Sequence, residues 1–290
     1  TELGKNGFSP FKAHWREHPD RDDAWAAEER SKIGDERFRR EHELEFLIDE
    51  ETLIDSIKLA SLESKDPIYK TGQIRWFKTP KKGHLYVVAL DPSLGTGGDP
   101  SAIQVFEADT TTQVAEWKHN RTAMPEQIKL LASINKQIVE ETKEPKNLYY
   151  SLENNTIGEA ALISLAEYGE ENIPGTMLSE PKQMGATRRY RRGFNTTNKS
   201  KLAACSKFKN LLESGKLAIF SSNLISELKT FVASGGSYAA KIGETDDLVM
   251  ASLLAVRMLQ HLQSYHLDLD THIRDHSEIL EPLPFIMSIG

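Results

Sequence analysis

The pattern of apolar and polar positions divides the chain near residue 70. Over residues 22–48, charged residues alternate loosely with apolar ones without strand signals, which favours helix. A short amphipathic piece follows at 53–62, and the polar, Pro- and Gly-containing stretch 63–83 is typical of a linker or of an edge strand and loop. We therefore predict a helical extension over residues 1–70 and a second domain over residues 71–290.

Beyond Gly83 the pattern changes to that of strands and helices in a defined order. Apolar, β-rich runs over 84–90, 101–108 and 112–119 are joined by short turns rich in Pro, Gly and Asp, which predicts three antiparallel strands. A helix over 126–141 begins behind Pro125, a fourth strand covers 147–152, and a second helix covers 157–168. This order predicts an α/β fold with a ribonuclease H-like mixed sheet flanked by helices.

The remaining elements are shorter and less regular. We predict a short fifth strand at 176–178, an exposed basic loop at 183–198, a helix at 199–212, a strand at 217–220 and a helix at 223–232. The pair Gly235-Gly236 indicates a hairpin or loop over 234–241. Thr245 is a favourable N-cap for a long apolar helix over 246–263.

Composition narrows the function classes. No apolar run in the 290 residues approaches the roughly 18 needed for a membrane span, and the N-terminus has no signal-peptide core, so we expect no membrane insertion and no secretion. The single cysteine, Cys205, excludes an internal disulfide and a cysteine-based zinc site. The chain begins without Met, which leaves open whether it is a whole protein or an excised piece.

Three separated acidic positions form the candidate chemistry. Asp91 ends the first predicted strand, Glu153 follows the fourth, and the pair Asp246-Asp247 opens the last helix. In a ribonuclease H-like sheet the ends of the first and fourth strands are neighbours, so these carboxylates would converge. Convergent carboxylates repel one another unless a cation neutralises them, and Mg²⁺ or Mn²⁺ prefers such oxygen ligands. Two such ions roughly 4 Å apart can promote phosphodiester hydrolysis.

Each acidic position also has an ordinary structural interpretation. Asp91-Pro92 is typical of a turn, the residues after Glu153 are typical of a solvated turn, and Asp246 or Asp247 could complement the helix dipole. Their joint placement favours catalysis. The Gly-rich loop after Asp91 could also cradle phosphate, but the sequence has no P-loop motif.

A basic segment stands out in a chain whose net charge is −7. Residues 181–210 contain nine Lys or Arg residues and no Asp or Glu. Because local charge decides whether a polyanion is attracted, we expect this segment to contact the phosphates of double-stranded DNA. The expected contact residues are Lys182, Arg188, Arg189, Arg191, Arg192, Lys199 and Lys201.

With these residues identified, the chain resembles the C-terminal nuclease half of a tailed-phage large terminase subunit of the T-even type. The resemblance rests on DPSLGTGGDPSA around Asp91, SLENNTIGEA around Glu153, RRGFNTTNKSK from Arg191 and GETDDLVMASLLA around the Asp pair. It implies that Asp91, Glu153 and one of Asp246 and Asp247, with Asp247 favoured, bind catalytic metal. Asp99 falls on a motif position and is implied to assist. The N-terminal stretch resembles the end of the family's ATPase half and its hinge.

The resemblance implies a two-metal-ion endonuclease that uses Mg²⁺ or Mn²⁺ to cut concatemeric viral DNA with little sequence preference. The implied partners are the ATPase half, the portal ring and the small terminase subunit, at the procapsid portal in the host cytoplasm. The P-loop motor is missing, so we expect no DNA translocation by this chain alone. The alternatives are a Holliday-junction resolvase or transposase-like nuclease, a non-catalytic docking module of the packaging machinery and, more remotely, an actin-like ATPase.

Overall fold

The computed structural model of the chain describes residues 15–34, 38, 42, 51–180 and 192–263. Its centre is a seven-stranded mixed sheet with the strand order β1-β2-β5-β4-β3-β6-β7. The strands are β1 (Tyr69–Thr71), β2 (Ile74–Trp76), β3 (Tyr86–Asp91), β4 (Ser101–Glu107), β5 (Thr112–His119), β6 (Leu148–Leu152) and β7 (Thr176–Met177). A separate hairpin consists of β8 (Phe231–Ser234) and β9 (Ser237–Ala240).

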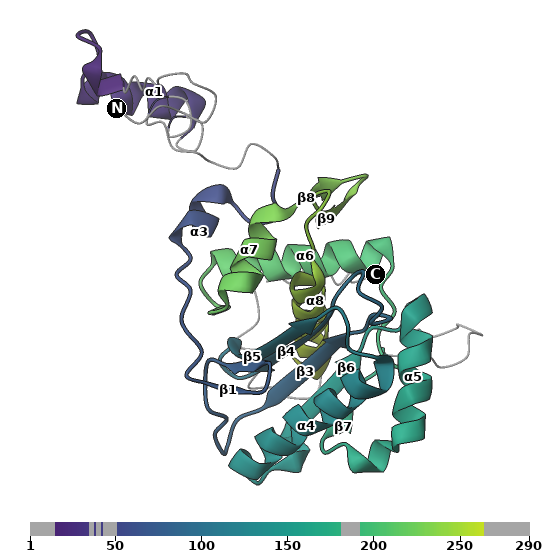
Figure 1. The fold of residues 1–290 in the computed structure, drawn as a ribbon. Helices are drawn as coiled ribbons and strands as arrows, with labels where there is room; N and C mark the ends of the chain where they lie inside the picture. The colour runs from purple at the N-terminus through teal and green to yellow at the C-terminus, as the bar shows by residue number, and fades with distance from the viewer. Residues whose placement is uncertain (1–14, 35–37, 39–41, 43–50, 181–191, 264–290) are drawn as a thin grey trace, which may run out of the picture.

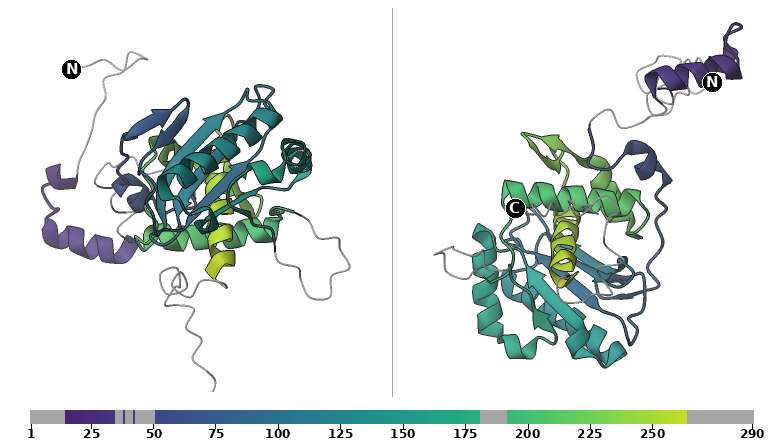
Figure 2. Two further views of the ribbon diagram at one scale, coloured as in Figure 1. Left: turned by 90° about the horizontal axis from the view of Figure 1, so that it is seen from below. Right: turned by 180° about the vertical axis from the view of Figure 1, so that it is seen from behind.

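Helices cover both faces of the large sheet. They are α3 (Ser56–Ser61), α4 (Met124–Thr142), α5 (Thr156–Tyr168), α6 (Asn198–Glu213), α7 (Ser222–Thr230) and α8 (Asp247–Gln263), and α1 (Asp23–Ile33) precedes them. Short 3-10 turns lie at Trp15–Glu17, Pro145–Asn147 and Glu170–Asn172. The helices α4 and α5 lie in front of the sheet in Figure 1, and α8 crosses its other face in Figure 2.

The pairing of β3 explains how the predicted acidic positions can meet. Its neighbours are β4, which runs antiparallel, and β6, which runs parallel with Leu90 opposite Leu152. The carboxyl ends of β3 and β6 therefore lie side by side, although some 60 residues separate them in the chain. The three antiparallel strands β3, β4 and β5 and the parallel fourth strand confirm the predicted mixed sheet.

Alternation along the central strand separates two hydrophobic cores. Val87 and Ala89 face the core shared with α6, α7 and α8, whereas Tyr86, Val88 and Leu90 face α4 and α5. Successive side chains of a strand point to opposite faces, so one apolar run supplies both cores. Burial on both faces is the reason that this run is continuously apolar rather than alternating.

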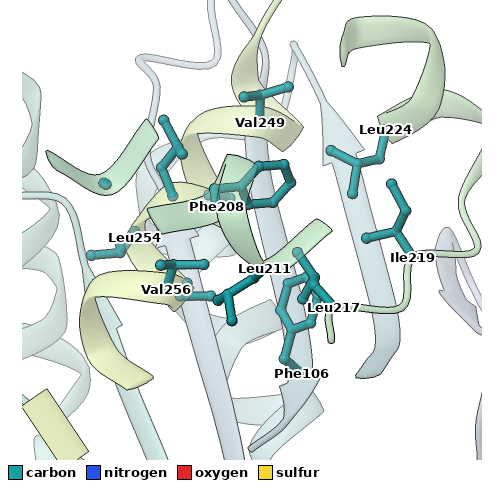
Figure 3. Close-up of a cluster of buried hydrophobic side chains, with 14 of the residues drawn as sticks. Phe106, Phe208, Leu211, Leu217, Ile219, Leu224, Val249, Leu254 and Val256 are labelled. Atoms are coloured by element: carbon teal, nitrogen blue, oxygen red, sulfur yellow. The ribbon is translucent and has the colours of Figure 1, made fainter. Parts of the chain in front are cut away.

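The core beneath α8 contains large side chains from several elements. Figure 3 shows Phe208 and Leu211 of α6 packed with Leu254 of α8 and Phe106 of β4. Phe208 is completely buried. This layer supports the helix whose first turn carries the acidic pair.

We expect Phe208→Ala to lower the free energy of unfolding by about 3–5 kcal/mol, because it removes a buried ring and leaves a cavity. The measurement is urea denaturation followed by circular dichroism, with the midpoint falling and the slope unchanged. The control is Ile163→Ala, because that side chain is 61% exposed. A Phe208→Ala midpoint close to that of Ile163→Ala would contradict the packing described.

The N-terminal residues form a small cluster of their own. The side chain of Asp22 accepts a hydrogen bond from Trp25 N at 2.8 Å and caps α1. Trp15, Ala26 and Phe38 pack against one another in a core separate from the two cores of the sheet. This unit lies outside the layered body in all views (Figures 1 and 2). The domain boundary near residue 70 stays a prediction.

Residues 51–62, on the N-terminal side of that boundary, contribute Leu53, Ile54 and Leu59 to the core beneath α8.

Three predicted elements differ from the structure. In place of the strand expected at 217–220, the structure has a single β-bridge between Ala218 and Thr112. The pairing does not continue because the next backbone N–H groups, of Phe220 and Ser221, donate to the side chain of Gln113 at 2.7 and 3.0 Å. The helix expected to reach residue 232 ends at Thr230, since Phe231 and the residues after it pair in β8. The last helix begins at Asp247, one residue later than expected. The expected hairpin at 234–241 is confirmed.

Within the part of the chain that the structure describes, no helix is both long enough and apolar enough to cross a membrane.

Candidate active site

An acidic cavity of about 360 Å³ opens where β3 and β6 end and α8 begins. Its walls come from four parts of the chain: the loop after β3, the β6–α5 junction, the first turn of α5 and the residues leading into α8. The lining residues are Asp91, Pro92, Ser93, Asp99, Pro100, Glu153, Asn155, Ile157, Gly158, Glu244, Thr245, Asp246 and Asp247. The three acidic positions predicted from the sequence therefore share one cavity.

Asp91 is the last residue of β3 and lies opposite Ala102 of β4. The strand before it is fully buried, so the backbone that carries the carboxylate is held on both sides by neighbouring strands. Burial, followed by repulsion from Glu153 and then from Asp247, raises the pKa of Asp91 well above its ordinary value. A cation bound beside it would remove this repulsion.

Glu153 continues the line of β6 and is 9% exposed. Its backbone N–H donates to Leu90 O at 3.0 Å, and its Oε1 accepts from Asn155 Nδ2 at 2.8 Å. The first turn of α5 packs directly on this residue: a Cβ at Gly158 would lie 2.1 Å from Glu153 O. A side chain at position 158 would clash with the backbone of Glu153, so this position requires glycine.

Asp247 is the first residue of α8 and is 8% exposed. Burial raises its pKa, and the Lys118 ammonium of β5, 3.3 Å from Oδ2, acts in the opposite direction. Among the described residues, the buried Oδ2 therefore has the ion pair with Lys118 but no hydrogen bond of good geometry.

The partly buried Lys118 and the buried Glu227 form an ion pair next to Asp247. Lys118 donates to Glu227 of α7 and to Thr245 Oγ1, and Glu227 Oε2 accepts from Val249 N at 3.0 Å in the first turn of α8. Burial raises the pKa of Glu227 to about 7 despite its contact with Lys118. This network holds the start of α8 against the sheet.

Asp246 differs from its neighbour in its contacts. Its carboxylate accepts from Ala240 N at 3.3 Å in the β8–β9 hairpin and lies 3.9 Å from Lys201 Nζ. Its side chain is 27% exposed. Asp246 therefore connects the hairpin and α6 to the cavity, whereas Asp247 is fixed from the sheet side.

The other predicted residues are placed as follows. Asp99 lines the cavity and is exposed. Lys199 is exposed in the first turn of α6, and Lys201 is directed toward Asp246. Arg192 forms an ion pair with Glu170, at the end of the sheet beside β7. Lys182, Arg188, Arg189 and Arg191 lie outside the described residues.

Sequence reasoning missed Lys118, Glu227 and Asn155. A lysine in an amphipathic strand and a glutamate in an amphipathic helix look like solvated residues, and no local pattern shows that they meet. Asn155 offered a weak signal, because Asn at the residue before a helix ordinarily caps it. In the structure its side chain makes no capping bond and contacts Glu153 instead.

The donor set fits a hard divalent cation. Asp91, Glu153 and Asp247 all line the cavity and supply only carboxylate oxygens, the ligands that Mg²⁺ and Mn²⁺ prefer. Within the described ranges, no three acidic, His or Cys side chains are gathered at the spacing of a formed metal centre. The carboxylates line the cavity walls.

We expect the melting temperature of the protein in EDTA to fall as the pH rises from about 5 to about 8. The pKa values of Asp91, Glu227 and Asp247 are all raised in the folded state. For each group, the folded state binds more protons than the unfolded state at any pH between the unfolded-state pKa and the folded-state pKa. Stability is therefore lost as the pH rises through that range. Differential scanning calorimetry measures this. Adding Mn²⁺ should stabilise most at high pH, and a melting temperature that rises with pH in EDTA would contradict the expectation.

Known proteins resemble the chain in both sequence pattern and fold. The family model described as the terminase RNase H-like domain matches residues 88–259. The large terminase nuclease from thermophilic phage G20c superimposes with a TM-score of 0.54 at 18% identity, covering 71% of this chain and 98% of that one. Its form with bound magnesium gives 0.53 at 20% identity, covering 71% and 97%. At these identities the structural likeness establishes the fold, and the predicted ribonuclease H-like fold is confirmed.

Proposed function

The chain belongs to the terminase RNase H-like family, and from that premise we propose that it is a metal-dependent endonuclease that cuts concatemeric viral DNA during genome packaging. The observation that carries the proposal is the convergence of Asp91, Glu153 and Asp247, from three separate elements, on one acidic cavity. The solved G20c nuclease with bound magnesium supports the choice of a divalent cation.

In this proposal the three carboxylates bind the metal ions, and the residues around them orient the carboxylates and the substrate. Asp91 and Glu153, on the rigid ends of β3 and β6, and Asp247, on the first turn of α8, would hold two Mg²⁺ or Mn²⁺ ions. Such ions supply Lewis-acid stabilisation of the attacking and leaving oxygens of a phosphodiester. Lys118 favours the ionised form of Asp247 and would orient it through the ion pair at 3.3 Å. Asp99, exposed at the rim, would assist substrate placement.

The basic residues would hold the DNA backbone without reading its sequence. Lys199 and Lys201 lie at the beginning of α6, and Lys201 is 3.9 Å from the cavity residue Asp246. Phosphate contacts orient a duplex but carry no base information, so cleavage would be largely sequence-nonspecific. The proposed partners are the ATPase half of the same protein, the portal ring and the small terminase subunit, at the procapsid portal in the host cytoplasm.

The test is cleavage of supercoiled plasmid in the presence of Mg²⁺ or Mn²⁺. We expect nicked and linear products with either metal and none with EDTA, and no products from Asp91→Ala or Glu153→Ala. Equal cleavage by these variants would refute the proposal. Preference for a four-way junction over linear duplex would indicate a resolvase. A protein that shows no heat of Mn²⁺ binding in calorimetry would be a docking module.

A further inference from the structure

A buried arginine outside the acidic cavity is connected to one of its carboxylates. Arg257 lies on α8, and its side chain is 11% exposed. Its guanidinium forms an ion pair with Glu180 and lies 5.1 Å from the centre of the Phe194 ring. Its remaining contacts are the carbonyl of Asn195 at 3.1 Å and Thr196 Oγ1 at 3.3 Å. The guanidinium thus joins Glu180 to the short segment 194–196.

That segment runs alongside the end of β6. Phe194 N donates to Leu152 O at 3.1 Å, and Asn154 N donates to Phe194 O at 2.7 Å, which makes a parallel bridge between Phe194 and Glu153. A Cβ at Gly193 would lie 2.7 Å from Leu152 O, so the approach of the two chains requires glycine there. The backbone of Glu153 is therefore held between β3 and the segment that Arg257 anchors.

A side-chain link completes the connection to the carboxylate. Thr196 N donates to Asn155 Oδ1 at 3.2 Å, and Asn155 Nδ2 donates to Glu153 Oε1 at 2.8 Å. Asn155 precedes α5 but makes no side-chain capping bond to it. The amide gives up the usual stabilisation of its own helix and instead bridges Thr196 and Glu153. The series of contacts runs from Arg257 through Thr196 and Asn155 to the cavity.

Arg257 and Glu153 also interact electrostatically. Burial lowers the pKa of Arg257, while Glu180 and Glu153 both raise it. The guanidinium and the Glu153 carboxylate therefore attract each other, in addition to the series of hydrogen bonds that joins them. Lys118, by contrast, contacts its carboxylate Asp247 directly at 3.3 Å.

We propose that Arg257 is a positioning residue for the metal centre: acting through Thr196 and Asn155, it orients the Glu153 carboxylate and thereby sets the affinity for the catalytic cation. This inference rests on the proposed nuclease function. Hydrogen-bonded partners behind a ligand orient it, and their loss typically weakens metal affinity or activity roughly 10- to 100-fold. The interaction depends on the forked geometry of the guanidinium, which lysine lacks.

The test compares Mn²⁺ binding by isothermal titration calorimetry in the full chain and its variants. We expect Arg257→Lys and Asn155→Ala each to weaken Mn²⁺ binding roughly 10- to 100-fold and to raise the Mn²⁺ concentration for half-maximal plasmid cleavage by the same factor. The maximal rate at saturating Mn²⁺ should change less. The double variant should bind no more weakly than the poorer single variant, because both act through one path.

The matched control is Arg75→Lys. Arg75 also pairs with a buried glutamate of the sheet, Glu116, at 2.9 Å, and neither residue lines the cavity. It should lower the midpoint of urea denaturation without changing Mn²⁺ affinity. Asn155 is exposed, so Asn155→Ala should fold even if Arg257→Lys does not.

Two outcomes separate this inference from the proposed function. If wild type binds Mn²⁺ and both Arg257→Lys and Asn155→Ala bind it equally well, Arg257 has only a structural role and the inference is overturned. The same holds if Asn155→Ala binds normally and Arg257→Lys does not fold. If wild type itself binds no Mn²⁺, the nuclease proposal fails and this inference fails with it.

Discussion

Replacing Asp91 by Asn is expected to slow plasmid cleavage by about a thousandfold, because the stabilisation supplied through a metal ligand amounts to several kcal/mol and each 1.36 kcal/mol corresponds to a factor of ten. Burial raises the pKa of Asp91, and repulsion from Glu153, Asp247 and Asp246 raises it further. Its removal takes away a ligand and relieves repulsion at the same time. We therefore expect the variant to be inactive but at least as stable as wild type in EDTA.

The measurement is the initial rate of supercoil loss at saturating Mn²⁺, together with the melting temperature in EDTA. Asp109→Asn is the matched control, since Asp109 lies at the opposite end of β3, where it accepts a hydrogen bond from Leu85 N at 2.8 Å. It should cleave at the wild-type rate. An Asp91→Asn protein that cuts within tenfold of wild type would remove this residue from the metal centre.

Asp247→Asn is expected to reduce cleavage by roughly a hundred- to a thousandfold, and Asp246→Asn by less than about tenfold. Asp247 is 8% exposed, and its charge raises the pKa of Asp91 more than the charge of Asp246 does. Asp246 is occupied by the hairpin backbone at Ala240 and by Lys201. The first substitution would remove a metal ligand and the second a support for the hairpin.

The discriminating measurement is Mn²⁺ affinity for the two variants in parallel. Asp247→Asn should bind Mn²⁺ much more weakly than wild type, while Asp246→Asn should retain binding. The two substitutions change the net charge equally and lie one residue apart, so each controls for the other. The reverse order of effects would assign the ligand to Asp246.

Asp247 and Glu153 are each held in place by polar or charged residues from other parts of the fold. Asp247 is backed by Lys118 from β5, and Glu153 is backed by Asn155 and, at longer range, by Arg257 from α8. Lys118 and Arg257 do not line the cavity themselves, whereas Asn155 does. Such support is needed because a site loses function when its ligands move by a fraction of an ångström.

Most of the regular elements could be predicted because their signals are local. The continuous apolar run before Asp91 indicated a strand buried on both faces, and the 3.6-residue spacing behind Pro125 indicated the helix α4. Elements that depend on side-chain contacts could not be predicted in this way. The bonds from Gln113 that replace a strand at 217–220 join residues more than 100 positions apart and leave no periodic pattern.

The sequence by itself determined that Asp91 and Glu153 end buried strands, and the order of elements in a ribonuclease H-like sheet made those ends neighbours. Only the tertiary structure shows how the two adjacent aspartates differ: Asp247 is more buried, and Asp246 contacts the hairpin. Asp247 is the first residue of α8, whereas Asp246 precedes the helix and its carboxylate accepts a hydrogen bond from the β8–β9 hairpin. The seating of α8 on the sheet and the ammonium of Lys118 place Asp247 inward, because burying a carboxylate requires a nearby partner that only the folded chain supplies.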